Sequence, residues 1–172
     1  MSMSNPKDDM KSYKNMMGRY LGADPGSSSG AIAWIDIENN TIINKGFFEF
    51  SKHTLREWYD MLCELNITSK TSLVLENVHG MPKMSTVAVS TFMKNVGHIE
   101  MALTAAHIPF EKVTPQKWMK FYGMKKDKNE TKTEWKKRLR EKLQQLMPDL
   151  KVTNNNADAY LIAYYNWKTK TQ

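Results

Sequence analysis

The sequence contains a single cysteine, Cys63, among its 172 residues. One thiol cannot form a disulfide within the chain, and it cannot supply a cysteine-based zinc cluster. No apolar run reaches the roughly 18–20 residues that cross a bilayer, so we expect no membrane partner. The first nine residues also lack the apolar core of a secretory signal. These absences favour a reducing, cytoplasmic location.

Acidic residues are fewer than basic ones: the chain has 18 Asp and Glu and 25 Lys and Arg, which gives a net charge of +7. Much of the excess lies in residues 125–142, which hold nine basic and four acidic residues. A polyanion such as a nucleic acid backbone is the natural partner of this segment. The alternative is a solvated helix face of mixed charge. The lysines that we expect to contact phosphates are Lys120, Lys125, Lys126, Lys128 and Lys132.

The order of predicted elements favours one α/β domain over residues 18–172. Alternating apolar patterns and turn residues predict strands over 19–23, 31–37, 41–50, 71–75 and 109–113. Helical spacing and caps predict helices over 55–65, 85–107, from 115, over 131–146 and from 157. The expected fold is a five-stranded mixed sheet flanked by helices on both faces. Gly97, inside the longest helix, indicates close packing there. Residues 1–17 are polar and aperiodic, which is typical of a flexible N-terminal extension.

Three acidic residues stand in distinctive local settings. Asp24 follows the first predicted strand, Glu76 ends the apolar run Leu73-Val-Leu, and Asp158 begins the last predicted helix. If the fold brings them together, they make a cage of carboxylate oxygens. Such cages hold Mg²⁺ or Mn²⁺ and support two-metal cleavage of phosphodiesters.

Each acid also has a simpler interpretation. Asp before Pro-Gly is a common turn former, so Asp24 could serve the turn alone. Glu76 could form a salt bridge with one of the many lysines. Asp158 could be favoured by the helix dipole, which stabilises any acid in a first turn.

Four short motifs occur in order along the chain. They are Leu21-Gly-Ala-Asp24-Pro-Gly26, Leu75-Glu76-Asn77-Val78, Val113-Thr-Pro115-Gln-Lys-Trp118 and Ala157-Asp158-Ala159. With these motifs the chain resembles the RuvC-type Holliday-junction resolvases of the ribonuclease-H-like superfamily, over about residues 19–168. It is most similar to the forms carried by bacteriophages, which would place the protein in the host cytoplasm.

The resemblance implies a metal-dependent endonuclease that resolves four-way (Holliday) DNA junctions by hydrolysing phosphodiesters. Its catalytic and metal-binding residues would be Asp24, Glu76 and Asp158, with two Mg²⁺ or Mn²⁺ ions per site. It also implies branched DNA as the substrate and a homodimer built around the helix at 85–107. The DNA-contacting lysines of the family match Lys120 and Lys132 most nearly.

The chain departs from the family pattern at one place. The family usually has a further acid one helical turn before the last Asp, where this chain has Asn154-Asn155-Asn156. Asn155 could be a helix cap, or it could be a further metal ligand that brings no charge. Two alternatives therefore stay open: a ribonuclease-H-like nuclease that acts on other branched DNA or on RNA, and a non-catalytic nucleic-acid-binding module. His79 and the backbone of Ser27–Ser29 are further candidates for phosphate contact.

Overall fold

The structure is a computed structural model that describes residues 17–26, 30–66, 68, 70–78 and 85–171. Residues 1–16 of the predicted extension lie outside this part of the chain, and so do Ser27–Ser29 and His79. Met17, which the sequence places in that extension, is buried.

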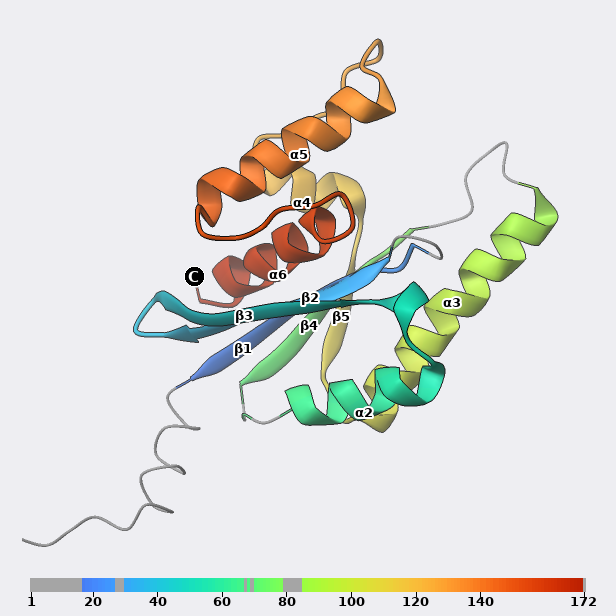
Figure 1. Cartoon of the computed structure of the whole chain (residues 1–172), viewed down its shortest axis with the longest axis vertical. Coiled ribbons are helices and arrows are strands. Elements are labelled where there is room, and N and C mark those ends of the chain that lie inside the picture. Colours follow the sequence, from blue (N-terminus) through green and yellow to red (C-terminus); the bar gives the residue numbers. More distant parts are fainter. Residues whose placement is uncertain (1–16, 27–29, 67, 69, 79–84, 172) are drawn as a thin grey trace, which may run out of the picture.

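A single mixed sheet of five strands forms the centre of the molecule (Figure 1). The strand order is β3-β2-β1-β4-β5. β1 pairs with β2, and β2 with β3, in antiparallel fashion, whereas β1 pairs with β4, and β4 with β5, in parallel. The strands are β1 (Gly18–Asp24), β2 (Ala31–Glu38), β3 (Thr41–Glu49), β4 (Thr71–Glu76) and β5 (Phe110–Val113). The five-stranded mixed sheet predicted from the sequence is confirmed.

The turn between β2 and β3 is made by Asn39 and Asn40. Their φ angles are 48° and 59°. Positive φ at both central residues is typical of a two-residue type I′ hairpin, and asparagine tolerates this conformation better than most residues. Asn39 and Asn40 therefore form the hairpin turn between β2 and β3.

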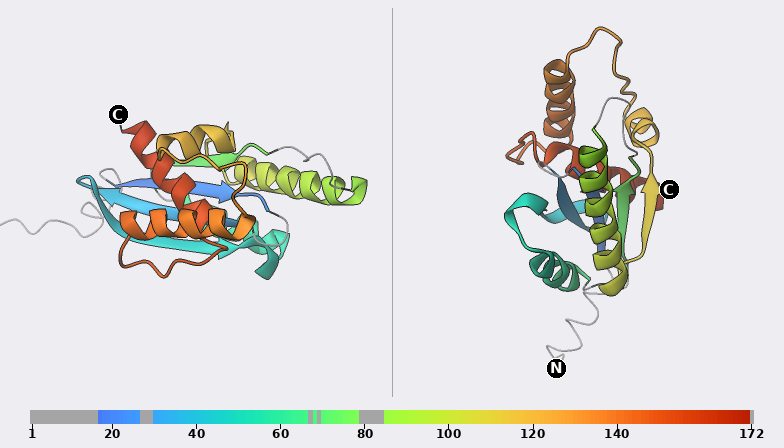
Figure 2. Two further views of the ribbon diagram at one scale, coloured as in Figure 1. Left: turned by 90° about the horizontal axis from the view of Figure 1, so that it is seen from above. Right: turned by 90° about the vertical axis from the view of Figure 1, so that its right-hand side faces the viewer.

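Helices cover both faces of the sheet, as Figures 1 and 2 show. One apolar core joins the sheet to α4 (Pro115–Phe121), α5 (Lys132–Leu146) and α6 (Ala157–Lys170). A second core joins its other face to α2 (Leu55–Leu65) and α3 (Thr86–Ala105). The short 3₁₀ turn η1 (Phe50–Lys52) connects β3 to α2. No helix in the described ranges is both long and apolar enough to span a membrane.

The N-termini of α2 and α5 are fixed by capping boxes. At α5 the hydroxyl of Thr131 accepts a hydrogen bond from the backbone N–H of Glu134, whose carboxylate accepts one from the N–H of Thr131. The predicted start of this helix is confirmed. The prediction for Gly97 is wrong: a Cβ at this position would meet nothing within 4 Å, because Gly97 lies on an exposed side of α3.

Candidate active site

The ends of β1 and β4 place Asp24 and Glu76 beside each other. Ala23 of β1 is in parallel register with Leu75 of β4, and Asp24 and Glu76 are the next residues. The two acids therefore end adjacent strands, and neighbouring strands lie about 4.8 Å apart. Ala23 and Leu75 belong to the core on the side of α2 and α3. Because side chains alternate along a strand, both acids point to the other face, which α4, α5 and α6 cover.

Asp158 reaches the same place because α6 lies directly on β1. Gly22 has no side chain, and a Cβ there would be 2.2 Å from the backbone nitrogen of Ala163 and 2.4 Å from the carbonyl oxygen of Ala159. The helix therefore contacts the strand backbone. Further along α6, the side-chain amide of Asn166 donates a hydrogen bond to the carbonyl of Leu21 at 3.0 Å. The helix thus runs back along β1, and its first turn lies towards the strand end that carries the other two acids.

One oxygen of Asp158 is buried without a hydrogen-bond partner. Asp158 is only 9% exposed. Its Oδ2 accepts a hydrogen bond from the ammonium of Lys136 on α5, whereas its Oδ1 has no partner. An unsatisfied buried oxygen is costly, since native structures pair nearly all such atoms. A bound cation would satisfy it.

The negative charges of the cluster act on one another. Burial raises the pKa of the Asp24 carboxyl to about 6, and the charge of Asp158 adds to the rise; Lys136 and the backbone N–H of Gly26 oppose it. The same N–H donates to Asp24 Oδ1 at 3.2 Å, so the predicted turn around Asp24 is also present. The turn and the acidic cluster are therefore compatible uses of one residue.

Glu76 is held by an aromatic donor. Its Oε1 accepts a hydrogen bond of 2.9 Å from the indole N–H of Trp118, which is fully buried on α4. Burial raises the pKa of Glu76 to about 8, and the charges of Asp24 and Asp158 add to the rise, against the effects of Trp118 and Lys136. The simple salt bridge between Glu76 and a lysine is absent from the ion pairs of the described residues.

Lys136 supplies the positive charge of this cluster. Burial alone would lower the pKa of its ammonium, but Asp158 and then the other two acids outweigh burial, so this pKa is raised. In the part of the chain that the structure describes, no three His, Cys, Asp or Glu side chains are placed to hold a metal ion as they stand. A metal ion at Asp158 would compete with the Lys136 ammonium for the charge of this carboxylate, whose Oδ1 is free of hydrogen bonds.

The structure also locates Asn155, and its interpretation as a helix cap is wrong. The residue at the N-cap position of α6 is Asn156. The amide nitrogen of Asn155 instead donates a hydrogen bond of 3.2 Å to Oε2 of Glu49, at the end of β3. Asn155 is thus fixed to an acid that the sequence did not single out.

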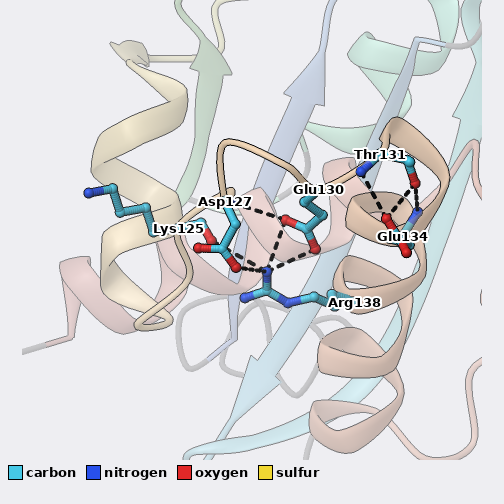
Figure 3. Close-up of polar contacts among 6 residues, drawn as sticks. All are labelled: Lys125, Asp127, Glu130, Thr131, Glu134 and Arg138. Carbon is cyan, nitrogen blue, oxygen red and sulfur yellow. Dashed lines mark hydrogen bonds and ion pairs between the residues drawn. The ribbon is translucent and has the colours of Figure 1, made fainter.

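A basic loop between α4 and α5 carries most of the predicted DNA-binding lysines. Arg138 of α5 holds this loop (Figure 3): its Nη1 donates to both carboxylate oxygens of Glu130, at 2.9 and 3.0 Å, and to the carbonyl of Lys125 at 3.4 Å. Hydrogen bonds between charged groups, such as those of this one nitrogen to the two oxygens, are stronger than those between neutral groups. The loop backbone is therefore tied to α5.

Three of the five predicted lysines line a single cavity of about 620 Å³, whose apolar part includes Met119 and Met124. These lysines are Lys120, Lys125 and Lys126. Lys128 and Lys132 are exposed and lie outside this lining. None of the five takes part in an ion pair among the described residues, so their charges are available to an anion.

Comparison with known proteins agrees with the architecture. No model of a protein family matches the chain, and no curated protein matches it in sequence. A solved structure of T. thermophilus RuvC in complex with a Holliday junction substrate is similar, with a TM-score of 0.61 and 14% identity over 90% of this chain and 97% of that one. Another Thermus thermophilus RuvC structure gives a TM-score of 0.55 and 13% identity over 91% and 98% of the two chains. The fold is ribonuclease-H-like, as in RuvC.

Proposed function

We propose that the protein is a divalent-metal-dependent endonuclease that resolves four-way DNA junctions, with residues 18–172 as its nuclease domain. The observation that carries this proposal is the partnerless buried oxygen of Asp158 beside two further carboxylates. The ribonuclease-H-like fold supports the proposal, and so does the basic loop between α4 and α5. The phage-like form remains part of the proposal.

The chemistry of the donors fits Mg²⁺ or Mn²⁺. Carboxylate and amide oxygens are the hard ligands that these ions prefer. Asp24, Glu76 and Asp158 would hold two ions, and Oδ1 of Asn155 would be a further ligand. When bound, such ions make water acidic enough to attack and neutralise charge on the scissile phosphate.

The protein's own residues prepare this chemistry in two ways. Trp118 donates to one oxygen of Glu76 and so fixes the carboxylate on the face of the sheet that it shares with Asp24. Lys136 balances Asp158 before a metal ion is bound. If a bound ion neutralised Asp158, the ammonium of Lys136 would be available to a DNA phosphate.

A substrate panel tests the proposed function. The wild type should cleave a four-way junction with Mg²⁺ or Mn²⁺, and it should cleave flap, duplex and DNA–RNA hybrid substrates much less. Preferential cleavage of a flap or a hybrid would favour the alternative nuclease instead.

The ion pair between Lys136 and Asp158 favours a second candidate, a non-catalytic nucleic-acid-binding module. That candidate requires junction binding with no cleavage in either metal.

The replacement of Lys136 by Met should make the protein more dependent on metal. Without divalent ions, the free energy of unfolding should fall by about 1–3 kcal/mol because Asp158 loses its partner. Added Mg²⁺ should then raise the melting temperature of the variant more than that of the wild type, since the ion displaces no ammonium. Thermal unfolding with and without Mg²⁺ measures both effects.

Lys137→Met is the matched control for this comparison. The Lys137 side chain is 68% exposed, and its ammonium lies 3.8 Å from the exposed carboxylate of Glu141. The control should behave like the wild type in both conditions. Equal Mg²⁺ stabilisation of the wild type and Lys136→Met would contradict competition between the ammonium and the ion.

The basic loop should contribute to affinity through phosphates. Lys125→Gln should weaken junction binding about equally for junctions of different sequence. It should also reduce the slope of log affinity against log salt by about 1, because one phosphate contact is lost. Lys70→Gln removes the same charge at an exposed position just before β4, at the opposite end of that strand from Glu76, and should leave the slope unchanged.

A homodimer is the proposed assembly, since cutting opposed strands of a two-fold junction suits a two-fold dimer. The exposed apolar residues of α3 support it: Val87, Met93 and Met101 are 75%, 44% and 66% exposed. Light scattering should give twice the 19.9 kDa of one chain. A mass of one chain at the concentrations that cleave junctions would argue against the dimer.

A further inference from the structure

Glu49 is a buried acid outside the cluster of Asp24, Glu76 and Asp158. It is the last residue of β3 and is 9% exposed. Its Cα pairs with Ala31 of β2, and Ala31 pairs with Asp24 of β1. Residues opposite one another on neighbouring strands point to the same face of a sheet. Glu49 therefore lies on the face that carries Asp24, two strands away, whereas Phe48 before it belongs to the opposite core.

Asn155 connects Glu49 to the start of α6. A carboxylate can only accept hydrogen bonds, so the group of Asn155 that faces Glu49 is its NH₂. The Oδ1 of the same amide then remains for another partner. Asn155 stands three residues before Asp158, within the stretch Asn154-Asn155-Asn156 that lacks the further acid of the resolvase pattern.

The surrounding contacts hold this bridge in place. Asn156 accepts a hydrogen bond of 2.8 Å from the N–H of Thr153 and donates one of 3.0 Å to the carbonyl of Lys151, which orders the backbone next to Asn155. On the other side, Lys52 donates to Oε1 of Glu49 at 3.0 Å and leaves Oε2 to Asn155. Lys52 is 67% exposed, so water screens much of its charge.

We infer that Glu49 is a positioning residue that supplies, through Asn155, the negative charge missing one helical turn before Asp158. Its carboxylate orients the amide so that Oδ1 remains available to a divalent ion, and its charge increases the electron density on that oxygen. The negative charge thus lies on Glu49, one hydrogen bond away from Asn155, instead of on residue 155 itself. This role rests on the proposed function, because it requires a metal ion at the three carboxylates.

Mn²⁺ binding to the full chain tests this role directly by calorimetry. Glu49→Gln keeps an acceptor for Asn155 and removes only the charge. Partners that orient a metal ligand typically change metal affinity by about 10–100-fold. We therefore expect the Mn²⁺ dissociation constant of Glu49→Gln to rise by about that factor. Junction cleavage should shift to higher Mn²⁺ concentration in the same proportion. Glu64→Gln, at an exposed position of α2, is the matched control and should bind Mn²⁺ like the wild type.

Moving the negative charge from Glu49 to residue 155 tests the role more sharply than Glu49→Gln alone. Asn155→Asp alone places two carboxylates at hydrogen-bond distance, so it should bind Mn²⁺ no more tightly than the wild type. Asn155→Asp combined with Glu49→Gln should restore wild-type binding or exceed it, which is a strongly non-additive double-mutant cycle. Circular dichroism of each variant without metal checks that the fold is intact.

Two outcomes would overturn the role of Glu49 in different ways. If the wild type cleaves junctions but Glu49→Gln binds Mn²⁺ equally well, or the two substitutions are additive, the role fails and the proposed function stands. If the wild type binds no Mn²⁺ and cleaves nothing, the proposed function fails and the role fails with it.

Discussion

Asp24→Asn should abolish junction cleavage and preserve junction binding. Asp24 ends β1 beside Glu76 and is one of the three carboxylates that we propose as metal ligands. Changes to the outer partners of a metal ligand already cost about 10–100-fold, so the loss of a direct ligand should reduce the cleavage rate by more than about 100-fold. Binding should survive, because it depends mainly on phosphate contacts by lysines elsewhere. Single-turnover cleavage and gel-shift titrations measure the two properties.

The same variant should not be less stable without metal. The pKa of Asp24 is raised by burial and by the charge of Asp158, so its ionised form is disfavoured in the fold. An amide of the same shape removes this repulsion and can still accept from the N–H of Gly26. Asp149→Asn, on an exposed loop, is the control and should cleave normally. Retained cleavage by Asp24→Asn would exclude the proposed site.

Gly22→Ala should destabilise the protein and also reduce cleavage. The new methyl group would lie 2.2 Å from the backbone nitrogen of Ala163 and 2.4 Å from the carbonyl oxygen of Ala159, and neither backbone can give way as a side chain can. Overpacking typically costs about 1–3 kcal/mol, and a backbone contact of this kind should reach at least the upper end. If α6 moves away to make room, Asp158 moves with it.

Gly97→Ala is the matched control, since it introduces the same methyl group where nothing lies within 4 Å. In a helix this change should stabilise by about 0.5–1 kcal/mol. Urea unfolding of both variants gives the comparison. A Gly22→Ala protein as stable as the wild type would contradict the close contact of α6 with β1.

Local patterns in the sequence predicted the elements that carry the three acids. An apolar run that ends in an acid, a turn after Asp24 and a helix start before Asp158 are all short-range features. The order of the elements predicted a mixed five-stranded sheet. The likeness to RuvC structures supports this fold, whereas the catalytic roles of the acids remain predictions.

The partners of those acids could not be predicted in the same way. Lys136 belongs to a run of basic residues on α5, and sequence alone does not tell which of them turns towards α6. Only its position next to the buried Trp135 gives a weak signal. Trp118 occurs in a recognised motif, but its hydrogen bond to Glu76 depends on how α4 packs. Glu49 was missed because its contact with Asn155 joins positions 106 residues apart.

The position of α6 on β1 has a consequence for the folding of the chain. Asn166 lies 145 positions after Leu21, to which it is hydrogen-bonded, so one face of the first strand stays uncovered until nearly all of the described chain has been synthesised. Contacts between such distant positions slow folding, and an uncovered apolar strand favours aggregation. A ribosome-bound chain that stops before residue 157 should therefore need chaperone protection and should carry an incomplete set of acids.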